Sequence, residues 1–216
     1  MNDETETLPP VIVSCVCLLG MLLGMGVSGC SNSGQPNTPE HSAEPGLLAE
    51  YHGEKVYQAD VERYQQNVDA LSSGGAADPL TTEEALNEIL RNTVLLEEAQ
   101  RLGYEATQAE IDAMVENVEL SYSMPEGKEM IDQYCQKVGI TVEEYFALME
   151  EQAPRSIARQ KLLNAVGEAY CEEHGLTFTR VNPPEEMVEA REAYVADLFA
   201  QAQDEITYYI WIDVVS

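Results

Sequence analysis

The chain has 216 residues, which is enough for one ordinary domain and a tail. Its 39 acidic residues far outnumber its 11 Lys and Arg residues, and the formal net charge at pH 7 is −28. This charge argues against nucleic-acid binding, because a phosphate backbone would be repelled along the whole approach. It favours solubility, and partners that are cationic or neutral.

An uncharged apolar run covers residues 11–29, with the sequence VIVSCVCLLGMLLGMGVSG. As an α-helix it would measure roughly 28 Å, close to the thickness of a bilayer core. The run is therefore compatible with the apolar part of an export signal, with an uncleaved membrane span or with a buried helix. The preceding sequence, MNDETETLPP, is acidic, whereas signal peptides normally begin with Lys or Arg.

The run ends in Val27-Ser28-Gly29-Cys30, which resembles the lipobox of bacterial lipoproteins. In such proteins small residues precede a cysteine that receives diacylglycerol and becomes the mature N-terminus. The resemblance implies a signal peptide over residues 1–30, lipid attachment at Cys30, and a location at the extracytoplasmic face of a bacterial cell membrane. Residues 31–46 are polar and rich in Pro, Gly and Ser, and we expect a flexible tether there.

The first elements expected after the tether are two short strands. LLAEY at residues 47–51 is followed by a turn and by Val56-Tyr57. An apolar face then predicts a helix over residues 58–71. A loop, SSGGAADP, separates it from a long helix that begins near Thr82 and stops at Gly103.

Two capping boxes predict the starts of later helices. Thr107 pairs with Glu110, and Thr141 pairs with Glu144. In each box the two side chains satisfy backbone N–H groups that the first turn of a helix leaves without partners. Between the two boxes, the sequence predicts a short helix that ends near Gly139.

The helix that opens at the second box continues toward Gly175, and Pro154 predicts a kink or a break in it. Asn182-Pro183 predicts an N-cap followed by proline at the first position of a last helix, which reaches about Asp204. Residues 206–215, ITYYIWIDVV, predict a strand whose nearest candidate partner is the strand pair at 47–57. We therefore expect a mostly α fold of five or six helices, with a small β-sheet formed by strands near the two ends of the mature chain.

These elements resemble, in their order, the helical N-terminal domain of the SurA/PrsA group of extracytoplasmic chaperones. The segments that carry the resemblance are HGEKVYQADV at 52–61, EEALNEILRNTVLLEEA at 83–99 followed by Leu102-Gly103, and TQAEID at 107–112. The resemblance implies a domain over residues 47–216 that binds unfolded or exported polypeptides without catalysis. The alternative is a structural or assembly lipoprotein of the cell envelope that retains the scaffold but not client binding.

Members of that group also carry parvulin domains, which catalyse prolyl isomerisation and contain paired histidines. The histidines of this chain are His41, His52 and His174, in the tether, in a turn and at a helix end. We therefore expect the isomerase domain to be absent and the chain not to be an enzyme. His52 and His174 are expected to be structural.

Other chemistry-bearing patterns give weaker expectations. With no phosphate-binding loop and no His-Glu-x-x-His pair, we expect neither a cofactor nor a metal. Cys135 and Cys171 could form a disulfide outside the cytoplasm, or could remain as two free thiols. We expect the basic residues Arg155, Arg159 and Lys161 to neutralise neighbouring helices rather than to bind a substrate carboxylate. We expect Tyr208, Tyr209 and Trp211 to contribute to the core on one face of the terminal strand, rather than to a sugar-binding platform.

Overall fold

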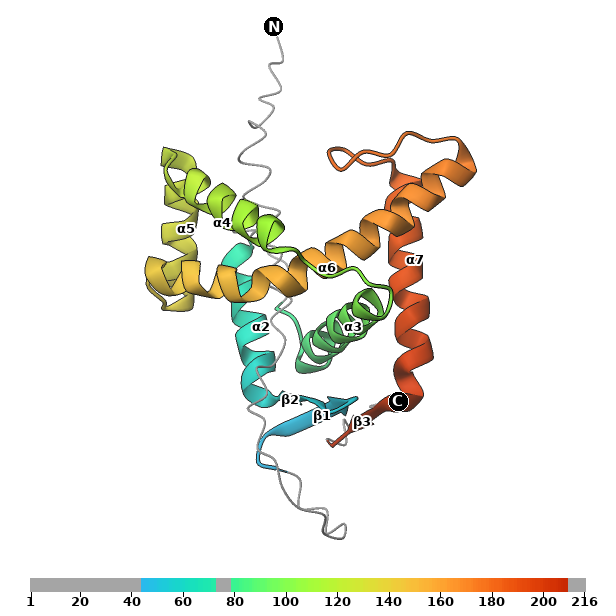
Figure 1. Ribbon diagram of the computed structural model, residues 1–216. Helices are drawn as coiled ribbons and strands as arrows, with labels where there is room; N and C mark the ends of the chain where they lie inside the picture. Colours follow the sequence, from blue (N-terminus) through green and yellow to red (C-terminus); the bar gives the residue numbers. More distant parts are fainter. Residues whose placement is uncertain (1–43, 73–78, 210–216) are drawn as a thin grey trace, which may run out of the picture.

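The computed structural model describes residues 44–72 and 79–209, and these form a mostly α-helical fold with one small sheet (Figure 1). This confirms the predicted fold class. Six α-helices and three strands lie in the described part of the chain. In chain order the elements are β1 (Leu47–Tyr51), β2 (Glu54–Tyr57), α2 (Gln58–Leu71), α3 (Thr82–Arg101), α4 (Gln108–Tyr122), α5 (Pro125–Val138), α6 (Val142–His174), α7 (Glu185–Ala202), the short 3-10 helix η2 (Gln203–Glu205) and β3 (Ile206–Tyr208).

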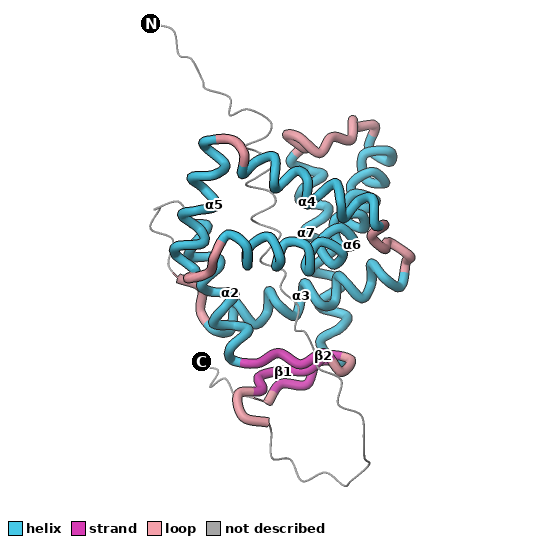
Figure 2. The backbone as a smooth tube through the Cα atoms, turned by 60° about the vertical axis from the view of Figure 1, so that its left-hand side comes forward, coloured by secondary structure: helices cyan, strands magenta, loops and turns pink. Residues whose placement is uncertain are grey.

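The sheet joins the two ends of the described chain, as the sequence predicted. Its strand order is β2-β1-β3, and both pairings are antiparallel. β1 faces β3 with Tyr51 opposite Ile206, and the N–H group of Tyr209 donates to the carbonyl of Leu48 over 2.9 Å. Figure 2 shows the sheet at one end of the molecule, with the helices above it. Residues 210–215 of the predicted strand lie outside the described residues.

The side chains of the last strand are only partly in the core. Ile206 is buried, Tyr208 is 39% exposed, and Tyr209 is half-buried with its hydroxyl bonded to Glu50. The expectation that the aromatic residues fill the core is therefore wrong for Tyr208. Trp211 lies outside the described residues.

The two predicted capping boxes are present at the starts of α4 and α6. The N–H group of Thr107 donates to the Glu110 carboxylate over 2.8 Å, and that of Thr141 to Glu144 over 2.7 Å. The threonine hydroxyls accept the return bonds from the backbone of the two glutamates. A third box, between Thr81 and Glu84, opens α3. Four-residue patterns thus set the starts of three helices.

The structure differs from the prediction in the absence of a break at Pro154 and in the start of the last helix. α6 runs without interruption from Val142 to His174, with Pro154 inside it, so the chain does not break there. Packing of α6 against α3, α4, α5 and α7 compensates the hydrogen bond that proline removes. α7 begins at Glu185 with Pro184 as its N-cap, because Asn182 has a left-handed φ of 51° and belongs to the preceding loop.

The core consists of three hydrophobic clusters. The first lies between the sheet, α2, the start of α3 and the end of α7. The third lies between the second half of α3, the middle of α6 and α7. The second is formed by α4, α5 and the first two turns of α6, together with the end of α2. α6 contributes buried residues to both the second and the third cluster, and therefore connects the two ends of the helical layer.

Close approaches between helices predict a difference between two glycines. A Cβ on Gly127 would lie 2.0 Å from the carbonyl oxygen of Ser121, where α5 turns back against α4. A Cβ on Gly167 would instead meet the guanidinium of Arg191, at 2.7 Å, and that side chain can rotate away. We expect Gly127→Ala to lower the free energy of unfolding by about 1–3 kcal/mol, and Gly167→Ala to be near neutral. Thermal unfolding followed by circular dichroism measures both, and equal midpoints for the two variants would contradict the backbone clash.

Candidate functional site

The second hydrophobic cluster forms a separate part of the molecule, which we call the α4–α5 lobe: α4, α5 and residues 142–149 of α6. In Figure 1 it lies on the side of α2 opposite α7. Its buried residues include Val118 of α4, Tyr134 of α5, and Tyr145 and Met149 of α6. The lobe therefore has its own core rather than sharing the one above the sheet.

A chain of aromatic rings leads from this core to the surface. Tyr134 meets Tyr145 edge-on at 5.7 Å between ring centroids, and Tyr145 meets Phe146 at the same distance. Phe146 in turn meets Tyr122 at 5.6 Å, nearly perpendicular. Edge-to-face pairs of this kind stabilise beyond the area that they bury. Since Phe146 and Tyr122 are only half-buried, this chain of rings reaches the surface of the lobe.

Several apolar side chains of the lobe remain at least partly exposed to solvent. α4 buries only Val118 and Ser121, and Leu120 on it is 52% exposed. Eight further apolar side chains contact the buried cluster but remain partly open to solvent: Leu71, Met114, Tyr122, Met130, Val138, Ile140, Val142 and Phe146. Apolar surface that stays uncovered is typical of interaction sites, and methionine adapts its shape to different partners. The arrangement is suited to binding apolar side chains.

Polar contacts fix the lobe to the rest of the fold. The hydroxyl of Tyr134 donates to the side-chain oxygen of Asn67 on α2 over 2.9 Å, in a buried position. Burial raises the pKa of Tyr134 to about 12, so the phenol stays protonated and remains a donor. The ammonium of Lys137 donates to the carbonyl of Ala70 over 2.9 Å. The lobe surface is therefore held in a defined position relative to α2.

Comparison with known proteins identifies the family. A family model described as "SurA-like N-terminal domain" matches residues 3–163. This chain belongs to that family. The match confirms the resemblance found in the sequence, and it includes the α4–α5 lobe and ends within α6. No curated protein and no solved structure matches the chain.

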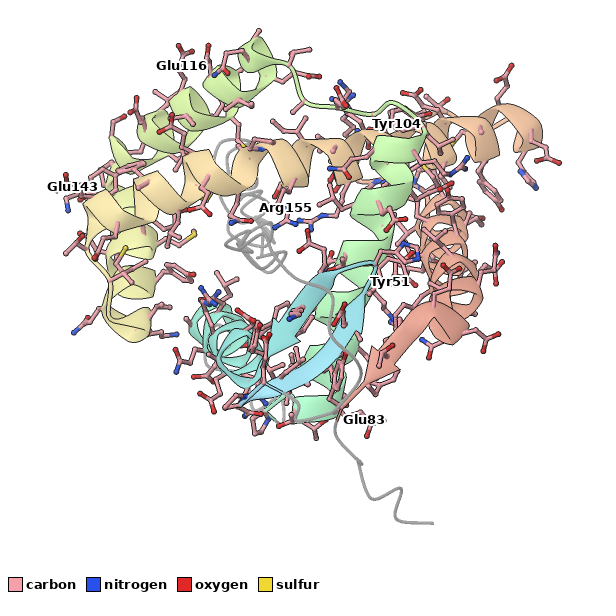
Figure 3. The ribbon with its side chains drawn as sticks, turned by 60° about the horizontal axis from the view of Figure 1, so that its bottom comes forward. Tyr51, Glu83, Tyr104, Glu116, Glu143 and Arg155 are labelled. Atoms are coloured by element: carbon pink, nitrogen blue, oxygen red, sulfur yellow. The ribbon has the colours of Figure 1, made fainter. Side chains whose placement is uncertain are left out.

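Two of the three basic residues singled out in the sequence, Lys161 and Arg155, lie near acidic residues of other elements, as expected. Lys161 pairs with Glu110 at 3.0 Å and donates to the carbonyl of Glu105, which joins α6 to the start of α4. Together with the capping bond from Thr107, Lys161 lowers the pKa of Glu110 to about 2. Arg155 lies 3.9 Å from Glu54 of β2, and Figure 3 shows it on the inner side of α6.

Arg159, one turn after Arg155, is buried. Burial and the neighbouring positive charge of Arg155 lower its pKa to about 10, which still leaves the guanidinium charged at neutral pH. The buried cation lies near Tyr64 of α2, whose own pKa burial raises to about 12. Arg159 thus places a positive charge at the junction of α2 and α6.

The cysteines are both buried and free in the described fold. Cys135 belongs to the core of the α4–α5 lobe, whereas Cys171 lies in the last turn of α6. Met149, which shares a cluster with Cys135, precedes Cys171 by 22 residues on that helix, or roughly 33 Å. In this fold a disulfide between them cannot form.

The predicted lipid-attachment site lies outside the described residues. Cys30 and the apolar run before it belong to residues 1–43, which the structure does not describe. Between residues 44 and 209, no described helix is both long enough and apolar enough to cross a membrane. The same described residues contain no group of His, Cys, Asp and Glu arranged to hold a metal ion.

His52 has a structural role, and only its position in the turn was predictable from the sequence. It is exposed in the β1–β2 turn, as expected, and both turn residues, His52 and Gly53, have positive φ, as a type I′ hairpin requires. Its Nδ1 atom lies 2.8 Å from the carboxylate of Glu97 on α3, and its Nε2 atom lies 2.6 Å from Glu205 of η2. The ring also stacks on Tyr51 at 4.2 Å. Partners 45 and 153 residues away leave no local signal in the sequence.

These contacts make stability depend on pH. Hydrogen bonds to Glu97 and then to Glu205 raise the pKa of His52 above its ordinary value of 6.5. Its contribution to stability is complete below about pH 6.5 and is lost as the pH rises through the pKa of the folded state. The unfolding midpoint of the wild type should therefore be higher than that of His52→Gln at about pH 6. The difference between the two midpoints should become smaller by about pH 9.

Denaturant unfolding over that pH range measures the effect. His174→Gln is the matched control, because the contacts that the His174 ring makes with described residues, a hydrogen bond to the carbonyl of Tyr170 and stacking on that residue, lie within its own helix. A gap that does not change with pH would show that protonation of His52 is not linked to folding.

Proposed function

We propose that this chain is a membrane-anchored, extracytoplasmic, chaperone-like lipoprotein that binds unfolded or exported polypeptides without catalysis. Membership of the SurA-like N-terminal domain family indicates a chaperone-like, folding-related role. The observation that carries client binding is the incompletely covered apolar surface of the α4–α5 lobe. Non-native segments expose apolar side chains, and burying these against the lobe removes apolar area from water on both partners.

The mechanism follows from burial alone. Half-exposed Met114, Met130 and Phe146 offer apolar contacts without requiring a fixed client sequence. The acidic residues around them keep the complex in solution through the net charge. Capture is reversible, because no covalent step is involved.

An aggregation assay tests this function. The full chain, held in nanodiscs of zwitterionic lipid, is added to a chemically unfolded reporter, with empty nanodiscs as the blank. We expect the chain to suppress aggregation without accelerating a proline-limited refolding step. Unchanged aggregation would favour the alternative, an assembly lipoprotein without client binding, and faster proline-limited folding would contradict the proposed absence of isomerase activity.

A matched pair of double variants locates the surface. The lobe variant, Leu120→Gln with Met130→Gln, removes two apolar side chains from the lobe. The loop variant, Leu176→Gln with Val181→Gln, removes two exposed apolar side chains from the loop between α6 and α7. We expect the lobe variant to need roughly tenfold more protein for the same suppression, and the loop variant to match wild type. An equal loss of aggregation suppression in the two double variants would mean that the lobe is not the binding surface.

Lipid anchoring rests on the lipobox-like segment and is tested at Cys30. We expect the protein from cells grown with a clickable fatty acid to be labelled, and its mass to show loss of residues 1–29. Cys30→Ser should abolish the label, whereas Cys135→Ser should retain it because Cys135 is buried in the lobe. An unlabelled protein that keeps residues 1–29 in the membrane would instead support a single membrane span.

A further inference from the structure

The outer face of α4 combines negative charge with an exposed apolar side chain. Asp112, Glu116, Glu119 and Leu120 are all exposed. Asp112 and Glu116 are four residues apart, as are Glu116 and Leu120, so these residues lie along one face of the helix. Glu119, three residues after Glu116, adjoins that face. Leu120 is therefore bordered by carboxylates.

This face carries negative charge that the described residues do not neutralise. Like charges at these spacings destabilise a helix, so the acidic row weakens α4 rather than supporting it. Within the described part of the chain, neither Glu116 nor Glu119 has an ion-pair partner. By contrast, Glu110 at the start of the same helix is paired with Lys161. The outer face is thus complementary to a cation that the described residues do not provide.

The surroundings have the same sign of charge. Residues 105–155 contain twelve acidic residues and three basic ones. Each of the three basic residues already has a partner in the fold: Lys128 with Asp132, Lys137 with a carbonyl of α2, and Arg155 near Glu54. Figure 3 shows Glu116 and Glu143 at the outer edge of the lobe, on α4 and at the start of α6. A ligand that approaches the lobe from this side meets a negative potential.

We propose that the outer face of α4 and the adjoining apolar surface of the α4–α5 lobe select unfolded segments in which apolar residues are interspersed with Lys or Arg. This inference rests on the proposed function and names its substrate class. The long stems of Lys and Arg can lie along Leu120 while their charged ends reach Glu116 and Glu119. Binding then relieves the repulsion along α4 while the apolar residues of the client are buried.

The experiment uses labelled unstructured peptides and the full chain in zwitterionic nanodiscs. Three peptides share their Leu and Phe positions and differ only at the intervening residues, which are Lys, Gln or Glu. Fluorescence anisotropy gives the affinity of each at low salt and at about 0.15 M salt. We expect the Lys peptide to bind about tenfold more tightly than the Gln peptide at low salt, with the difference shrinking at the higher salt.

Two charge-reversing double variants assign the preference to this face. Glu116→Lys with Glu119→Lys should reduce binding of the Lys peptide by about tenfold and improve binding of the Glu peptide. Glu172→Lys with Glu173→Lys is the matched control, since these exposed residues lie near the end of α6 and the change in net charge is the same. The control should change affinity by less than about twofold.

The possible outcomes distinguish a failure of the charge selectivity from a failure of the proposed function. Equal binding of the Lys and Gln peptides would overturn the selectivity and leave apolar capture intact. A Lys preference reduced equally by both double variants would also overturn it, by tracing the preference to the net charge of the whole chain. If no peptide binds and reporter aggregation is unchanged, the proposed function itself is wrong.

Discussion

Helix α6 has to bury residues in two separate hydrophobic clusters, and the arrangement of the other helices depends on this constraint. Its 33 residues extend about 50 Å. Tyr145 and Met149 fill the α4–α5 lobe near its start, whereas Ala158 and Leu162 pack with α3 in its middle. Pro154 lies between these two groups of residues. The residue that most weakens the helix is therefore at the point where α6 passes from one hydrophobic cluster to the other. The position of the lobe relative to the sheet follows from the course of this helix.

The acidic composition has two distinct physical roles in the fold. A few carboxylates make specific local bonds, above all the capping glutamates Glu84, Glu110 and Glu144, whose pKa values are lowered by the backbone N–H groups that they accept from. Most of the others face solvent, where they oppose self-association. A domain that keeps apolar side chains partly exposed needs such repulsion, because its uncovered apolar surface would otherwise bind other copies of the domain.

Local patterns predicted the elements of this fold well, and long-range packing decided what they did not. The boxes at Thr107 and Thr141 act within four residues, so the sequence alone placed the starts of α4 and α6 correctly. Of the kink or break that Pro154 predicts, the break does not occur, because packing on both sides of α6 holds the helix together. His52 was placed correctly in its turn, but its carboxylate partners come from α3 and η2. The candidate binding surface was not predictable, since nothing in the periodicity of α4 shows that Met114 stays half-open while Val118 is fully buried.

The proposed capture of clients by the lobe requires a balance between rigidity and incomplete burial. The edge-to-face rings from Tyr134 to Tyr122 and the buried bond to Asn67 hold the surface in place, so binding does not have to order it first. The side chains that remain partly exposed are methionine, branched aliphatic and aromatic residues from four helices and one loop, and each contributes only a modest contact area. Many weak contacts on a preformed surface give broad recognition with fast release. A chaperone-like module that must return its client to folding requires both properties, whereas a deep and fully apolar groove would hold the client too long.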